Sequence, residues 1–155
     1  MAAITTHQQK GREKAVHGVE SAELLGFEAV VRDSFSLVMA AREGIFARIA
    51  FEVADLLQLH LNQMADLLHT TTKTLQSYRH SKKKLSPAHS EQTLKLYALQ
   101  LKGKEVFGTA AAFRRWLGQP AYGLDGQVPL VLLETSGGID LVMDELERIA
   151  YGDLA

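Results

Sequence analysis

The stretch NQMADLLHTTTKTLQSYRHSKKK, residues 62–84, decides how the rest of the chain is interpreted. It runs from an apolar helical pattern through three threonines into a basic cluster. A helix-turn-helix packs two short helices at a steep angle, so it needs a small residue where they meet and apolar residues at fixed offsets. Ala65 supplies the small residue, and Leu75 and Tyr78 fall on one face of the second helix. The spacing predicts a helix-turn-helix, and the alternative is an ordinary helical hairpin with a solvated basic face.

The outward side of the second predicted helix carries hydrogen-bonding and basic side chains and no acid. Such side chains suit the base edges and phosphates of duplex DNA. His69 occupies the turn where many such motifs have glycine. Histidine tolerates a positive φ less well than glycine, which leaves the turn geometry open. The predicted DNA-binding residues are Thr71, Thr72, Lys73, Gln76, Ser77, Arg79, Lys82, Lys83 and Lys84.

Charge divides the chain into two parts, although its net charge is only −1. Residues 66–104 contain eight Lys or Arg and two acids, whereas residues 120–155 contain seven acids and one base. Such asymmetry suggests two different partners, one of them anionic. The alternative is surface charge that is distributed by chance and simply solvated.

Helical periodicity extends through almost the whole chain from Leu24 onward. There is no convincing pair of strands and no internal repeat, so the predicted fold is all-α. Residues 1–20 have little to bury and are predicted to form a mobile tail. Residues 21–103 are predicted to form a helix-turn-helix DNA-binding domain, and residues 104–155 a small C-terminal helical domain.

Apolar spacing also predicts which side of several helices is buried. An early stripe is predicted to comprise Phe27, Val30, Val31, Phe35, Val38 and Met39. The final helix is predicted to bury Ile139, Val142, Leu146 and Ile149. Capping residues are expected at Ser86 and at Thr135 or Ser136, and YGLDGQVP (122–129) is expected to be a turn-rich link.

Several classes of protein are excluded by what the sequence lacks. Without cysteine there is no disulfide, thiolate nucleophile or sulfur-ligated metal, and the six histidines show no paired ligand spacing. We therefore expect no metal and no cofactor. No apolar run approaches the roughly 18 residues of a membrane span, and the first residues lack a signal-peptide core, so a cytoplasmic protein is expected. No phosphate loop or paired-carboxylate site is evident, so we do not expect an enzyme.

Several motifs in the second half resemble those of the Xre-type antitoxins of RES–Xre toxin–antitoxin modules, also called the ParS or MbcA family. They are VFG (106–108), WL (116–117), LDGQVPLVLLET (124–135), Gly138 and the closing LERIAYGDLA (146–155). Upstream, GIFARIAFEVADLL (44–57) and MADLLHTTTKTLQSYR (64–79) are similar to the helix-turn-helix half of that family.

The resemblance implies an antitoxin that binds a RES-domain toxin, an enzyme that consumes NAD, and covers its active site with the C-terminal segment. It also implies that the N-terminal half binds operator DNA and represses the shared operon. A single helix-turn-helix contacts few base pairs, so a homodimer is expected, with a higher-order complex when the toxin is bound. The predicted toxin-binding residues are Asp140, Asp144, Glu147, Arg148, Tyr151, Asp153, Leu154 and Ala155.

Two alternatives stay open from the sequence. Arg148 could pair with Asp144 four residues earlier on the same helix instead of contacting the toxin. The whole chain could be a stand-alone helix-turn-helix transcriptional regulator, with a C-terminal domain that dimerises or senses a ligand.

Overall fold

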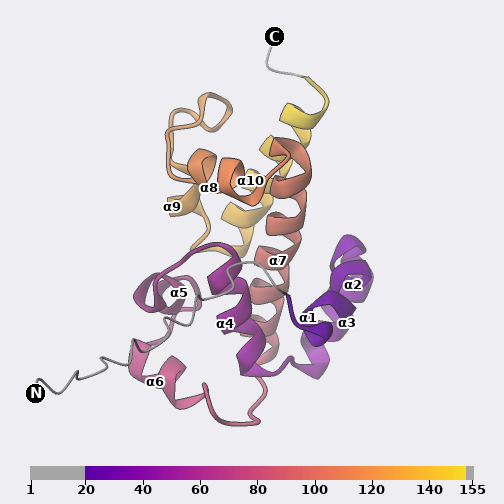
Figure 1. Ribbon diagram of the computed structural model, residues 1–155, viewed down its shortest axis with the longest axis vertical. Helices are drawn as coiled ribbons and strands as arrows, with labels where there is room; N and C mark the ends of the chain where they lie inside the picture. The colour runs from indigo at the N-terminus through magenta and orange to yellow at the C-terminus, as the bar shows by residue number, and fades with distance from the viewer. Residues whose placement is uncertain (1–19, 153–155) are drawn as a thin grey trace, which may run out of the picture.

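The computed structural model describes residues 20–152, and within them the chain is built from helices and turns, without a strand (Figure 1). The predicted all-α class is confirmed. Apart from Glu20, the predicted tail lies outside the described residues, as do Asp153, Leu154 and Ala155. The elements are α1 (Ala22–Gly26), α2 (Glu28–Arg32), α3 (Ser34–Glu43), α4 (Ala47–Leu56), α5 (Leu61–Leu67), α6 (Thr72–Ser77), α7 (Pro87–Phe107), α8 (Ala110–Leu117), the 3-10 turn η1 (Tyr122–Leu124), α9 (Pro129–Leu132) and α10 (Ser136–Ala150).

Helix α7 is the central support of the molecule. It packs against α2, α3 and α4 and also against α8 and α10 (Figure 1). Because neighbours surround it, residues on several of its sides are buried, among them Leu94, Leu96, Tyr97 and Leu99. The boundary expected at residue 103 therefore falls inside one continuous helix that both halves share.

The ends of the long helices follow local sequence chemistry. The hydroxyl of Ser86 accepts the N–H of His89 at 3.2 Å, and that of Thr135 accepts the N–H of Gly138 at 3.0 Å. Both predicted caps are confirmed, with Thr135 rather than Ser136 at the start of α10. Gly44 ends α3 with φ +81°, a conformation that L side chains rarely adopt.

The predicted early stripe is wrong at Phe35, Val38 and Met39, whose exposed fractions are 73%, 44% and 40%. In α3, Leu37 and Ala41 face the core instead. The reason lies at Asp33, which is extended and separates α2 from α3, so the helical phase of the first does not continue into the second.

Asp33 also fixes where α3 begins. Its carboxylate accepts hydrogen bonds from the hydroxyl and the N–H of Ser36, at 2.6 and 2.9 Å. These bonds hold the pKa of Asp33 below its ordinary value, because they stabilise the charged form. The cap thus sets a new register that a period count across residues 27–39 does not detect.

Candidate nucleic-acid and toxin interfaces

Helices α5 and α6 form the predicted helix-turn-helix. Ala65 and Leu75 are 2% and 1% exposed, as expected for residues at which the two helices meet. Tyr78 is half-buried and packs against the same core. The spacing that singled out these residues is therefore confirmed as a packing pattern.

The turn between these helices is closed by His69. This residue has φ +54°, so histidine takes the left-handed conformation that glycine adopts in many such turns. The backbone N–H of Thr70 returns to the carbonyl of Ala65 at 2.9 Å. The imidazole Nε2 lies 2.7 Å from the carbonyl oxygen of Glu134, and because a carbonyl only accepts, Nε2 carries the proton. The turn is thereby bonded to the C-terminal half, a contact that the sequence did not predict.

The side chains predicted to contact DNA on α6 fall into two groups. The Thr71 hydroxyl accepts the N–H of Thr74 at 3.1 Å and so caps the helix, and the Ser77 hydroxyl donates to the Thr74 carbonyl at 2.6 Å. The side chains of Thr72, Lys73 and Gln76 are exposed and make no hydrogen bond or ion pair within residues 20–152. The exposed amide of Gln76 is thus the best placed of the group to bond a base edge.

The basic run after α6 is fixed in place by backbone hydrogen bonds to the region before α4. The N–H of Leu85 donates to the carbonyl of Ile45 at 2.8 Å, and the N–H of Ala47 donates to the carbonyl of Lys83 at 3.0 Å. Lys83 Nζ lies 5.6 Å from the ring centre of Tyr78. The loop therefore holds its cations in defined positions and leaves their outer sides accessible.

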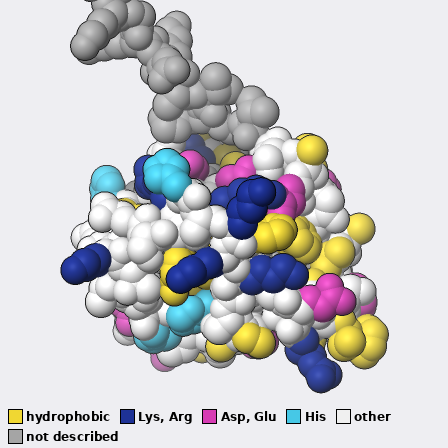
Figure 2. Space-filling model, turned by 90° about the horizontal axis from the view of Figure 1, so that it is seen from below, with side chains coloured by type: hydrophobic (Ala, Val, Ile, Leu, Met, Phe, Trp, Pro, Cys, Tyr) yellow, Lys and Arg dark blue, Asp and Glu magenta, His cyan; other side chains and the backbone are white. Residues whose placement is uncertain are grey.

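Aromatic rings support three further cations on this side of the molecule. Arg79 lies 4.8 Å from the ring centre of Phe51, and Lys84 lies 5.6 Å from that of Phe46. Arg48, which was not predicted to take part, lies 5.1 Å from the same Phe46 ring. Figure 2 shows Lys, Arg and His side chains spread over the face that contains α6. The antiparallel pairing of Phe46 with Lys84 brings Arg48 close to Lys84, and the Arg48 guanidinium also pairs with Glu23, with its Nε 2.8 Å from Oε2.

Four of the predicted toxin-binding residues lie on α10, namely Asp140, Asp144, Glu147 and Arg148, and Tyr151 directly follows the helix. The structure separates Asp140 from the others. Asp140 pairs with Lys95 of α7, whose Nζ lies 2.9 Å from Oδ1, and the same Nζ donates to Ser136 at 2.7 Å. Asp144, by contrast, is exposed and makes no ion pair within the described residues. Asp140 thus anchors α10 to α7.

Arg148 pairs with Glu145, not with Asp144. Its Nη2 lies 2.6 Å from Oε2 of Glu145, whose side chain is only 3% exposed, and it also donates to the Gly123 carbonyl at 3.3 Å. The predicted alternative of a pair with Asp144 is therefore wrong. Glu145 was not among the predicted residues. Its position next to Leu146 in the sequence does not indicate that a loop covers its carboxylate.

A shallow depression on the outer side of α10 brings most of the remaining predicted residues together. It is lined by Leu141, Asp144, Glu147, Arg148 and Tyr151. Leu141 and Tyr151 are large apolar side chains that are 55% and 82% exposed. An exposed leucine and tyrosine flanked by charges form the kind of surface that binds another protein.

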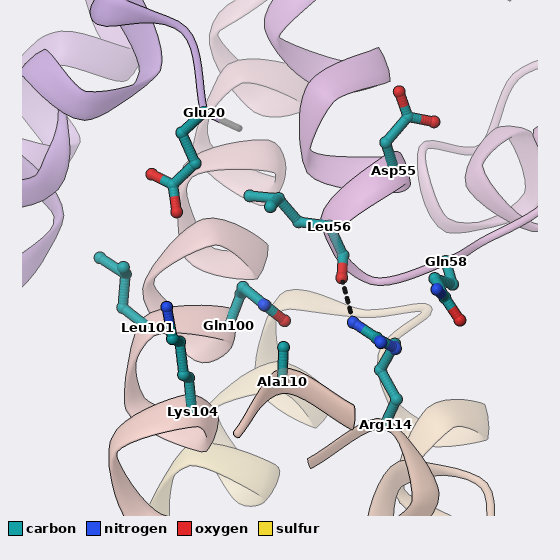
Figure 3. Close-up of a pocket in the computed structure, with 9 residues that line it drawn as sticks. All are labelled: Glu20, Asp55, Leu56, Gln58, Gln100, Leu101, Lys104, Ala110 and Arg114. Atoms are coloured by element: carbon teal, nitrogen blue, oxygen red, sulfur yellow. Dashed lines mark hydrogen bonds between the residues drawn. The ribbon is translucent and has the colours of Figure 1, made fainter. Parts of the chain in front are cut away.

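A second hollow lies between the two halves, where α4 faces α7 and α8, and has a volume of about 140 Å³. Figure 3 shows the Gln100 amide and the Arg114 guanidinium directed into it. Arg114 donates to the carbonyl of Leu56 at 3.2 Å, whereas the buried Oε1 of Gln100 has no hydrogen-bond partner among residues 20–152. At the rim, the Tyr97 hydroxyl donates to Glu20 at 2.6 Å, and burial raises the pKa of that hydroxyl. The hollow is therefore a small cavity between the two halves, with polar side chains from both of them.

Within residues 20–152, no group of three or more His, Asp or Glu side chains is arranged to hold a metal ion. Over the same residues, every helix is too short or too polar to cross a membrane.

Comparison with known families assigns both halves. Residues 36–97 match the antitoxin Xre-like helix-turn-helix domain, and residues 102–152 match the antitoxin Xre/MbcA/ParS C-terminal toxin-binding domain. Between positions 36 and 152 only residues 98–101 fall outside the two matches. No curated protein matches the chain. The helix-turn-helix therefore implies DNA as one partner and the C-terminal domain implies a toxin as the other, and the chain belongs to the family of Xre-type antitoxins.

Proposed function

We propose that this antitoxin neutralises a RES-type, NAD-consuming toxin by covering its active site with the C-terminal segment. The observation that carries the proposal is the match of residues 102–152 to a toxin-binding domain. The exposed side of α10 supports it, because Asp144 and Glu147 lie beside Tyr151 in one depression. A site that holds the pyrophosphate of NAD presents cations or helix N-termini. The carboxylates of the antitoxin would bind to these groups in place of the pyrophosphate. The chain itself performs no catalysis in this proposal.

The second part of the proposal is that the chain represses its own operon by binding operator DNA as a homodimer. It is supported by the exposed polar side chains of α6 and by the fixed cations of the adjoining loop. One short recognition helix reads few base pairs, so a two-fold dimer would read two half-sites about one helical turn, or a multiple of it, apart.

Deletion of residues 151–155 tests the toxin part of the proposal. The truncated chain keeps the buried face of α10, which comprises Ile139, Val142 and Leu146, so we expect it to fold and to bind DNA as before. NAD consumption by a co-expressed RES-domain toxin is expected to return, and it is measured in cell extracts by an enzymatic assay of NAD.

A deletion of the same length near the other end of the chain, residues 2–6, is the control and should leave neutralisation intact. Full neutralisation by the chain that ends at Ala150 would show that the last five residues do not cover the active site. Failure of the full-length chain to neutralise the toxin would contradict the RES assignment itself.

A further inference from the structure

The loop before α9 is a closed, hydrogen-bonded unit with one fully exposed aromatic ring. Backbone N–H groups of Leu124 and Gly126 donate to the carbonyl of Ala121 at 3.1 and 2.9 Å, and Ala121 donates to the carbonyl of Gln127 at 3.0 Å. Ala121 and Leu124 are buried and fasten the loop to the core. Tyr122 lies between them in sequence but is 94% exposed. The loop thus presents a tyrosine from a rigid backbone.

Glu145 and Arg148 hold this loop against α10. The backbone of Gly123 lies so close to the Glu145 carboxylate that a Cβ at position 123 would collide with it. Arg148 bonds both the buried carboxylate and the Gly123 carbonyl, at 2.6 and 3.3 Å. A buried carboxylate is costly unless it is paired, so this arrangement keeps Arg148 in place and, through it, the loop.

The Tyr122 loop and the depression on α10 form one continuous surface, because Arg148 belongs to both. The large exposed side chains on this surface are Tyr122, Leu141 and Tyr151. Arg148, on the helix, reaches the loop with its guanidinium. Tyrosine and arginine are enriched among the residues that contribute most to protein–protein binding. A tyrosine on a rigid loop also loses little conformational freedom when it binds.

We propose that Tyr122 is a second anchor that binds the toxin, in addition to the C-terminal segment, and that its ring inserts into an apolar pocket of the toxin beside the active site. In this proposal Glu145 and Arg148 are positioning residues that hold the loop of Tyr122. The inference rests on the proposed function and specifies its binding surface. The occupant is the toxin because the whole surface lies inside the matched toxin-binding domain. The exposed Asp144 and Glu147 at its border also complement the basic surroundings that a site for an anionic dinucleotide requires.

The test measures binding of the full-length antitoxin to a catalytically inactive RES-domain toxin by isothermal titration calorimetry. Tyr122→Ala removes only an exposed ring, so circular dichroism should be unchanged, while Kd is expected to rise at least tenfold. Phe35→Ala is the matched control, because it removes an exposed aromatic ring from α3 in the DNA-binding half, and should change Kd less than twofold.

A double-mutant cycle distinguishes positioning from direct contact for Arg148. Lysine keeps the charge but not the planar guanidinium fork, so Arg148→Lys should loosen the loop and raise Kd severalfold. In the Tyr122→Ala background the same change is expected to add no further loss, because the ring that it positions is gone. Losses that simply add would place Arg148 in contact with the toxin and overturn its positioning role.

Each other outcome is also decisive. A wild-type Kd that Tyr122→Ala leaves unchanged would overturn the anchor while leaving the antitoxin function in place. If that variant instead changes the oligomeric state seen by light scattering, with the same toxin Kd, the surface joins two copies of this chain and the anchor is likewise rejected. Absence of binding by the wild-type chain would reject the proposed function and the anchor together.

Discussion

Gly103 lies where α7 packs against α8, and it has no room for a side chain. A Cβ there would collide with the ring of Phe113, which is fully buried and stacks at 6.2 Å from Phe107. We expect Gly103→Ala to lower the free energy of unfolding by about 1–3 kcal/mol, the usual cost of overfilling a packed core. Urea denaturation followed by circular dichroism measures this change.

Gly137 in α10 supplies the comparison at the same residue scale. It is exposed, and a Cβ there would meet no atom within 4 Å. Gly137→Ala should therefore raise the free energy of unfolding by up to about 1 kcal/mol, because alanine favours the helix more than glycine does. Equal effects of the two substitutions would mean that the collision at position 103 is relieved by a small shift of Phe113.

Single residues also show what the sequence could predict. Ala65 and Leu75 were placed correctly because their burial depends on the spacing within two adjacent helices. Glu145 and Tyr122 gave no signal, because their roles depend on a loop and a helix that meet only after folding. His69 was recognised as unusual for its turn, but its partner, the carbonyl of Glu134, could not be found from the sequence.

At the scale of elements, α6 and the loop after it are expected to divide the work of DNA binding. Gln76→Ala should weaken operator binding by about 1–3 kcal/mol and leave binding to random duplex almost unchanged, since its amide is placed to read a base. Lys83→Ala should weaken both complexes alike and reduce the slope of log K against log salt by about 1, because one phosphate contact is lost. Fluorescence anisotropy at several salt concentrations separates the two effects. An equal loss on operator and random duplex for Gln76→Ala would deny that residue any base reading.

Periodicity predicted some elements well and failed at others for a physical reason. In α10 it correctly identified Ile139, Val142 and Leu146 as buried, because that helix has a single buried side, while the fourth predicted residue, Ile149, is only half-buried. In α3 it failed because the cap at Asp33 starts a new helix, and a pattern counted across the break has no common phase. In α7 periodicity has no single face to identify, because other helices cover this one on several sides.

At the scale of the whole molecule, we propose that the two functions separate near residue 103. Ile49, Val53, Met64 and Leu75, which form much of the helix-turn-helix core, all precede that point. A fragment that ends at Gly103 should therefore keep its helical circular dichroism and bind operator DNA, but not neutralise the toxin. Its melting temperature should fall by at least about 5 °C, since the packing of α7 against α8 and α10 is lost. An unfolded fragment would show that the chain folds only as one cooperative unit.

The contact between His69 and Glu134 has a consequence for how such antitoxins diversify. Together with Gln92, whose amide donates to the same carbonyl at 3.3 Å, His69 bonds a backbone atom and not a side chain. Every residue type offers that carbonyl, so the exposed side chain at position 134 can change freely, provided that the path of the main chain is kept. The donors have no such freedom. A chimera that takes its first half from one relative and its second half from another should therefore fail less often when histidine and glutamine are inherited at positions 69 and 92.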